Sequence, residues 1–169
     1  MADDGYFFNF EKMSYVKGKR PLGCTLCLVR DGSPQVPDLT VWRDKLFIAS
    51  ANLYPYNPGH ILVYPVRHVE DVRELTAEEE CALSALTRRL LDLLDAAYAP
   101  HGYNIGYNIG NAGGASISHL HLHIIPRYRG EMGIADLIAG KRVLVEDPRE
   151  TARRLQELAA QEPLSSSSS

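Results

Sequence analysis

The chain has 169 residues, of which 45% are hydrophobic, and carries a formal net charge of -3 at pH 7. This size and composition fit one domain with a substantial core. The slightly acidic balance excludes a protein that wraps nucleic acid through a basic surface. No apolar stretch reaches the length of a membrane span, and Met1 to Gly5 lack the start of a secretory signal. We therefore expect a cytoplasmic protein with a small anionic partner and no nucleic-acid or membrane partner.

The N-terminal half predicts three strands. Two are expected at 39–43 and 46–50, separated by the short turn Asp44-Lys45, which favours an antiparallel hairpin. A third is expected at 60–65, where a β-rich run follows Pro58-Gly59 and stops at a proline. Residues 1–20 before these strands are expected to be irregular.

The strongest helix pattern begins after Thr76. Thr76 and Glu79 form a capping box, and apolar residues then recur at helical spacing until Pro100. Two further strands are predicted at 103–108 and 119–126. The sequence therefore predicts an α+β fold, an antiparallel sheet with one long helix packed on it.

The C-terminal part predicts a helical extension. A short amphipathic piece is expected at 134–139, a strand at 142–146, and a charged helix from Pro148 to about Gln161. Residues 162–169 end in a serine run and are expected to be disordered. Residues 21–161 are thus expected to form a single domain.

Three histidines alternate with leucines at His119, His121 and His123. On a β-strand, this spacing predicts three imidazoles on one face and the leucines packed on the other. Clustered imidazoles suit solvation poorly, because their cationic forms repel one another. A zinc hydrolase that uses all three as ligands is disfavoured, because they would spread over roughly 13 Å, too far for bonds near 2 Å.

The glycine-rich loop 110–116 leads into these histidines. Glycines let a backbone approach an anion and expose its N–H groups, and Asn and Ser side chains add donors. A neutral imidazole beside a bound phosphate can attack phosphorus, and a second imidazole can orient the first or pass a proton to the departing group. The pattern therefore indicates phosphate chemistry.

Cysteine usage favours a reducing compartment. An odd count of three is unlike a secreted disulfide scaffold, and two of the three form Cys24-x-x-Cys27. Because no βαβ pattern surrounds this pair, metal binding is favoured over a thioredoxin-like redox role. Cys81 is expected to be an inert small hydrophobic residue in the long helix.

The run His119-x-His121-x-His123, followed by Ile124-Ile125, resembles the histidine triad (HIT) family. The resemblance implies that His121 is the nucleophile of a nucleotidyl-histidine intermediate and that His123 contacts the phosphate. It extends backwards through the loop and through residues 54–68, which end in Pro-x-x-His. The phosphate-contacting positions of the family fall on Asn108, Gly114 and Ser116.

The resemblance also places Asn52 at the position that binds the ribose, with Leu53 and Ile48 lining the base pocket. From the residues alone, a simple turn-stabilising role for Asn52 remains open. The resemblance also implies that His60 contacts the triad histidines without contacting the substrate itself. Ala115 departs from the pattern, because many relatives carry Gln there.

A zinc site follows from the same resemblance. In some branches, two cysteines, a Pro-x-x-His histidine and the first triad histidine bind zinc, which implies Cys24, Cys27, His68 and His119 here. Zinc would then be structural, and no organic cofactor is expected. Reduced cysteines without metal remain the alternative.

The resemblance is nearest to the bacterial branch that contains diadenosine tetraphosphate phosphorylases and hydrolases, and it implies a homodimer. The expected reaction is cleavage at the α-phosphate of a dinucleoside polyphosphate, with water or phosphate as the acceptor. Two alternatives remain. One is an adenosine phosphoramidate hydrolase, and the other is a nucleotide-binding regulatory protein with little turnover.

Overall fold

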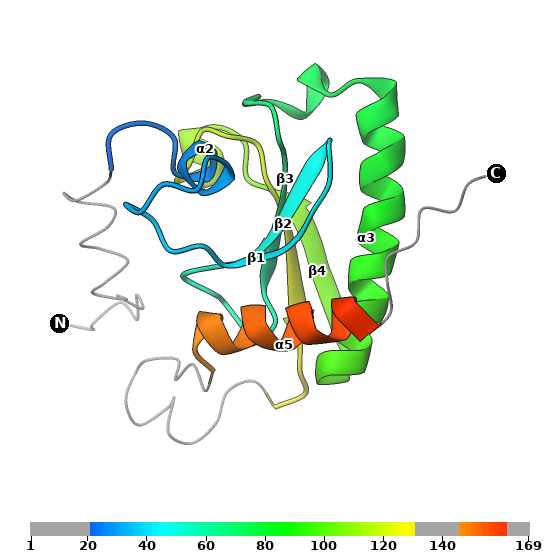
Figure 1. The fold of residues 1–169 in the computed structure, drawn as a ribbon. Coiled ribbons are helices and arrows are strands. Elements are labelled where there is room, and N and C mark those ends of the chain that lie inside the picture. Colours follow the sequence, from blue (N-terminus) through cyan, green and yellow to red (C-terminus); the bar gives the residue numbers. More distant parts are fainter. Residues whose placement is uncertain (1–20, 131–145, 162–169) are drawn as a thin grey trace, which may run out of the picture.

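The computed structural model describes residues 21–130 and 146–161, and these form one antiparallel sheet with helices packed on it (Figure 1). The sheet has five strands in the order β1-β2-β3-β5-β4, and every neighbouring pair is antiparallel. The predicted α+β class is confirmed. The strands are β1 (Thr40–Arg43), β2 (Phe47–Ala51), β3 (Ile61–Pro65), β4 (Gly102–Tyr107) and β5 (Leu122–Arg127).

The helices are α2 (Thr25–Arg30), α3 (Ala77–Tyr98) and α5 (Pro148–Gln161), with 3-10 turns η1 (Val72–Glu74) and η2 (Asn111–Gly113). The sequence did not predict α2, which has six residues and no side-chain cap at its start. The predictions for 1–20, 134–139 and 162–169 lie outside the described residues. So does most of the strand predicted at 142–146, and its described last residue, Glu146, lies in a bend.

The two faces of the sheet carry different clusters, because side chains alternate along each strand. One face packs against α3 to form the main core, and the other carries a smaller cluster beneath α2 (Figure 1). In the main core, sheet residues such as Phe47, Ile61 and Ile124 meet Leu90 and Leu94 of α3. On the opposite face, Leu26 of α2 packs on Ile48, Leu62 and Tyr64.

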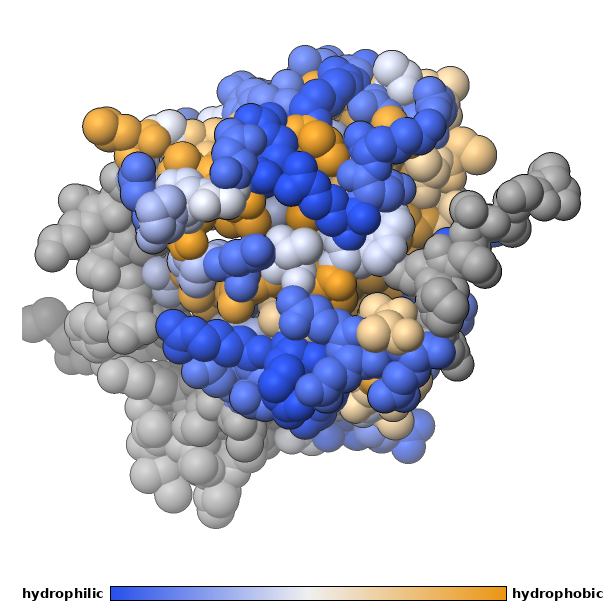
Figure 2. Space-filling model, viewed as in Figure 1, coloured by the Kyte–Doolittle hydropathy of each residue, from blue (hydrophilic) through white to orange (hydrophobic). Residues whose placement is uncertain are grey.

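The C-terminal helix α5 crosses β1 and β2 and ends near α3 (Figure 1). Leu155 is fully buried in the main core. The Tyr98 hydroxyl donates to Glu146 Oε2 at 2.7 Å, and Gln156 Nε2 donates to the Thr40 carbonyl at 2.6 Å. The outward surface of α5 is hydrophilic (Figure 2), so this helix closes the core with one face and meets solvent with the other.

The strand predicted at 119–126 begins later, at Leu122. The Leu120 N–H donates to the Val69 carbonyl at 2.7 Å, outside the sheet ladder, while β5 pairs with β3 only from Leu122 onward. Residues 119–121 are therefore held against the segment after β3. Of the three histidines, only His123 lies on a strand, and the prediction of one continuous histidine strand was wrong.

No helix in the described ranges is long and apolar enough to span a bilayer.

The carboxylate of Glu79 ties the start of α3 to the segment after β3. Glu79 is buried, and its carboxylate accepts hydrogen bonds from Arg67 Nε at 2.6 Å, Arg67 Nη2 at 2.7 Å and the Thr76 N–H at 2.8 Å. The Arg67 guanidinium is the main reason why the pKa of Glu79 falls from 4.5 to about 2. The predicted capping box is thus present, and it is reinforced by an ion pair.

Replacing this carboxylate should weaken the fold in a pH-dependent way. We expect Glu79→Gln to lower the free energy of unfolding at pH 7 by about 2 kcal/mol, because Arg67 is half exposed and solvent screens part of the pair. Since the pKa of Glu79 is depressed in the folded state, its stabilisation is complete above pH 4.5 and disappears as the pH falls toward 2. Urea unfolding at pH 7 and at pH 3 measures this difference. The exposed Glu80→Gln is the control, and an equal loss at both pH values would contradict the prediction.

Candidate functional site

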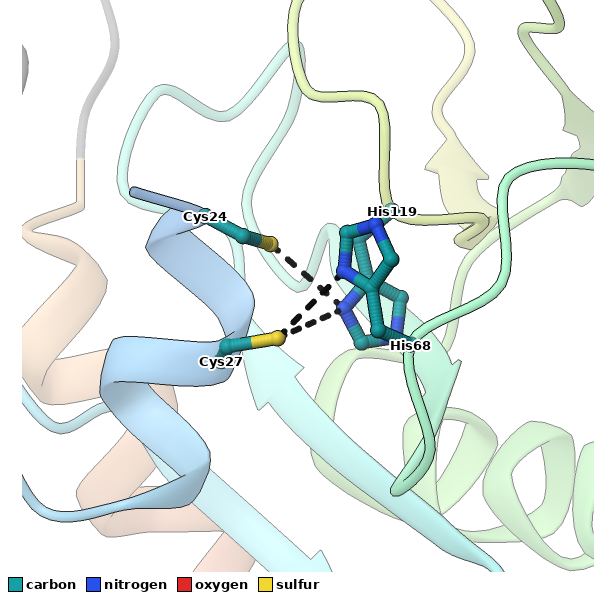
Figure 3. Close-up of side chains that lie close together, drawn as sticks. All are labelled: Cys24, Cys27, His68 and His119. Atoms are coloured by element: carbon teal, nitrogen blue, oxygen red, sulfur yellow. Dashed lines mark hydrogen bonds between the residues drawn. The ribbon is translucent and has the colours of Figure 1, made fainter. Parts of the chain in front are cut away.

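Two cysteines and two histidines from distant segments converge beside the sheet (Figure 3). Cys24 precedes α2, Cys27 lies on it, His68 follows β3, and His119 precedes β5. The Cys24 Sγ lies 3.5 Å from His119 Nδ1. The Cys27 Sγ lies 3.4 Å from His68 Nδ1 and 3.6 Å from His119 Nδ1. All four potential ligand atoms lie within 4.8 Å of one another.

This arrangement fits a tetrahedral zinc ion. Zinc bonds of about 2.3 Å to sulfur and about 2.05 Å to nitrogen place the two ligand atoms about 3.6 Å apart, which agrees with the three distances above. His119 Nε2–H donates to the Pro65 carbonyl at 2.9 Å, which leaves Nδ1 unprotonated toward the thiols. His68 Nε2 faces a carboxylate oxygen of Glu70 at 3.5 Å. Both imidazoles therefore have the outer partners that metal-binding histidines use.

The six residues predicted for catalysis and nucleotide binding line one cavity of about 300 Å³ between the sheet and α2. Leu53 also lines it. Ile48 is absent from the described lining and packs instead beneath Leu62 and Tyr64. The sequence therefore located the residues of the cavity, while their individual roles stay predictions. The six residues are Asn52, Asn108, Gly114, Ser116, His121 and His123.

Helix α2 separates the cysteine–histidine cluster from the cavity. Cys27 faces the two histidines, while Thr25, Leu26 and Val29 line the cavity. The sequence did not identify these three cavity residues. Their helical spacing is visible in the sequence, but the short segment gives no other signal that it forms a helix.

His121 is held with its Nδ1 away from the cavity. Its Nδ1–H donates to the His119 carbonyl at 2.8 Å. Since a carbonyl can only accept, Nδ1 carries the proton and Nε2 keeps its lone pair. His121 is only 4% exposed, and this burial lowers the pKa of its imidazole. The ring is thus neutral at pH 7, as a nucleophile must be.

A main-chain N–H fixes the protonation of a second pair of imidazoles. The Tyr56 N–H donates to His60 Nδ1 at 3.0 Å, so His60 must carry its proton on Nε2. That Nε2–H then donates to His123 Nδ1, also at 3.0 Å, and His123 carries its proton on Nε2. The Asn108 amide nitrogen lies 3.4 Å from this Nε2, and a half-turn of the amide places its oxygen there as an acceptor. His123 is therefore a donor on its cavity side.

The rings of His121 and His123 are neighbours, with centroids 4.8 Å apart, and both line the cavity. The His119 ring instead contacts His68 at 4.7 Å and is not part of the described lining. The predicted common face therefore holds for two imidazoles and is wrong for His119. The chain path before β5, set by Leu120, accounts for this difference.

The glycine-rich loop is closed on itself more than the sequence predicted. The N–H groups of Gly114 and Ala115 donate to the carbonyls of Asn111 and Gly110, both at 3.1 Å. Gly114 has a φ of +86°, which favours glycine at this position. These N–H groups are thus used within the loop. In the described part of the chain, the N–H and hydroxyl of Ser116 have no protein partner, so both can donate to an anion.

The Asn52 side chain has a role in a turn. Its Oδ1 accepts from the Tyr54 N–H at 3.1 Å, and its Nδ2 lies 3.2 Å from His60 Nδ1. Asn52 therefore does stabilise a turn, which was the alternative that the sequence left open. Asn52 also lines the cavity, and a contact with a ribose stays a prediction.

No Lys or Arg is among the cavity residues that the structure describes. The cavity therefore offers an anion hydroxyl, amide and imidazole donors rather than a fixed positive charge. The sequence model of the HIT domain family matches residues 33–130, which include the whole sheet and the histidine triad.

The chain belongs to the HIT domain family.

Among its HIT relatives, the "AP-4-A phosphorylase" of Mycobacterium tuberculosis is 40% identical over 134 residues, which cover 77% of this chain and 69% of that protein. The "Bis(5'-nucleosyl)-tetraphosphatase [asymmetrical]" of Schizosaccharomyces pombe is 35% identical over 57% of this chain and 53% of its own length. A solved structure of a zinc-bound histidine triad family protein from Mycobacterium smegmatis superposes with a TM-score of 0.68 at 25% identity, covering 83% of this chain and 96% of that chain. The resemblance inferred from the triad is thus confirmed.

The link from His60 to His123 can be tested by removing the donor while keeping a ring of similar size. We expect His60→Phe to lower the kcat of a reaction that uses His123 as a proton donor by roughly 10- to 100-fold, because His123 loses the partner that holds its proton on Nε2. The affinity for a phosphate-containing ligand of the cavity should change less than the kcat. Steady-state kinetics and calorimetry measure the two effects, with the exposed His101→Phe as a matched control. An unchanged kcat would exclude a role for this link.

Proposed function

We propose that this HIT protein cleaves a dinucleoside polyphosphate of the diadenosine tetraphosphate type at an α-phosphate, through a nucleotidyl-histidine intermediate on His121. One observation carries the proposal. His121 donates its Nδ1 proton to the His119 carbonyl and so presents an unprotonated Nε2 in a cavity with phosphate donors. The names of the relatives support this substrate class.

In the first step, His121 Nε2 attacks the α-phosphorus and forms a P–N bond. The bond between this phosphorus and the bridging oxygen breaks, and diadenosine tetraphosphate releases ATP. His123 Nε2–H can donate to the developing charge on the phosphate oxygens, and the Ser116 N–H and hydroxyl can donate to the other oxygens. The bound adenylate stays on His121.

In the second step, an acceptor oxygen attacks the same phosphorus and the P–N bond breaks, which restores the lone pair of His121 Nε2. We propose inorganic phosphate as the acceptor, and ADP is then the second product. The relative named "AP-4-A phosphorylase", with 40% identity over 77% of this chain, supports phosphate. Water would instead give AMP.

We propose that Cys24, Cys27, His68 and His119 bind one structural zinc ion. The sulfur–nitrogen distances of 3.4 to 3.6 Å and the outer partners of both histidines support zinc. When bound, zinc supplies a cross-link between α2 and the residue that orients His121. All three cysteines are free thiols, which agrees with the cytoplasmic location that we propose.

We also propose a homodimer that uses the edge of β4. Within the described residues, β4 pairs only with β5, and Ile105 on β4 is 45% exposed. An open edge with an exposed apolar side chain can pair with the same edge of a second copy.

The products of one assay test the proposed reaction. Diadenosine tetraphosphate, incubated with the protein and phosphate, should give ADP and ATP, and intact-mass analysis after quenching in base should detect an adenylate on His121. We expect His121→Asn to lose at least about 10³-fold in turnover and to retain AMP affinity. His101→Asn is the control.

Other products would revise this reaction. AMP plus ATP regardless of phosphate indicates a hydrolase. AMP binding without cleavage indicates either an adenosine phosphoramidate hydrolase, which an assay with such a substrate reveals, or a nucleotide-binding regulatory protein. Unchanged turnover in His121→Asn would contradict the proposed nucleophile.

Metal analysis tests the zinc site. Protein purified without chelator should contain about one zinc per chain. Cys27→Ala should lose most of this zinc and lower the thermal midpoint, because α2 loses its cross-link to His119. Cys81→Ala is the matched control, since Cys81 is exposed on α3 and lies outside the cluster. Equal zinc content in both variants would refute the assignment.

A further inference from the structure

Two hydroxyl groups lie side by side in the wall of the cavity. Ser50 Oγ and the Tyr64 hydroxyl are 3.0 Å apart, and the two residues are only 6% and 0% exposed. Apart from His121, they are the only buried residues in the described lining whose side chains carry polar atoms. The other buried lining residues are apolar: Leu26, Leu39, Ala51 and Leu62.

The strand register places this hydroxyl pair away from the phosphate end of the cavity. Ser50 on β2 is paired with Leu62 on β3, and Leu62 is paired with His123 on β5. Two strand spacings, about 10 Å, therefore separate Ser50 from His123. Because the cavity lining runs from His121 and His123 to Ser50 and Tyr64, a nucleotide with its α-phosphate at the two histidines can extend its nucleoside across the sheet toward the hydroxyl pair.

The pair keeps unused hydrogen-bonding capacity. Two hydroxyls carry two protons, and one is used in the bond between them. Among the described residues, neither hydroxyl has another hydrogen-bond partner. Burial raises the pKa of Tyr64 to about 12, so its hydroxyl stays a neutral donor. Because Tyr64 is fully buried, the Ser50 hydroxyl is the member of the pair that a ligand in the cavity can reach, and the Tyr64 hydroxyl orients it.

We propose that the Ser50–Tyr64 hydroxyl pair determines base specificity by hydrogen bonding to the polar edge of a purine in this cavity. The inference rests on the proposed function, which places the phosphate of the same nucleotide at His121. A purine suits the separation better than a pyrimidine, because its second ring carries polar atoms further from the ribose. The surrounding leucines contact the faces of the ring, and the hydroxyl pair supplies the directional contact.

Binding measurements on the zinc-loaded protein separate this role from a purely structural one. AMP, CMP and ribose 5-phosphate are titrated by calorimetry into the wild type, Ser50→Ala and Tyr64→Phe. We expect each substitution to weaken AMP binding by roughly 3- to 10-fold, as for one lost hydrogen bond. Ribose 5-phosphate binding should stay within about 2-fold, and CMP should lose less than AMP. Tyr103→Phe, which removes a hydroxyl outside the cavity, should change nothing.

Several results would overturn the inference. One is an unchanged AMP affinity in both variants. A second is an equal loss of affinity for AMP and ribose 5-phosphate, which would indicate that the pair is only a structural link between β2 and β3. A third is an equal loss of affinity for AMP and CMP. The two proposals fail differently. A wild type that binds neither AMP nor ribose 5-phosphate contradicts the proposed function itself, whereas normal AMP binding that ignores both substitutions contradicts only the role of the hydroxyl pair.

Discussion

The fixed position of His119 connects the two sites of this protein. Its Nδ1 faces two thiols, its Nε2–H is bonded to the Pro65 carbonyl, and its own carbonyl accepts the proton of His121 Nδ1. The residue is fully buried, so it has little freedom to move. Whatever holds the ring of His119 therefore also fixes the direction in which the lone pair of His121 points. The contacts of the His119 ring with the thiols and with Pro65 therefore influence the orientation of the His121 ring in the cavity.

The cavity offers hydrogen-bond donors to an anion and has no fixed cation among its described residues. Donors come from imidazole, amide and hydroxyl groups, and His123 receives its orientation through His60 from a main-chain N–H. Such groups are already oriented before a ligand arrives, so little reorganisation is needed when charge develops. Burial alone lowers the pKa of His121, so the ring stays neutral without a neighbouring cation. The proposed nucleophile and the proposed anion site are therefore compatible in one small cavity.

Much of this arrangement could be predicted from local patterns in the sequence. The capping box at Thr76 marked the start of α3, and the triad and its loop identified residues that do share a cavity. Errors arose where a tertiary contact overrides a local pattern. The bond from Leu120 to Val69 takes His119 out of the strand, and carbonyls within the loop occupy N–H groups that glycines were expected to expose. Helix α2 is too short to be recognised without the side chains that it packs against.

The position of α2 between two sites restricts how the cavity can change in evolution. Cys27 on one side and Thr25, Leu26 and Val29 on the other occupy fixed angles around one short helix. Inserting or deleting a single residue turns everything beyond it by about 100°, which separates the thiols from their histidine partners. Side chains at the three cavity positions can change in size without this effect. Diversity in this wall should therefore arise through replacement of side chains, while the length of the segment stays constant.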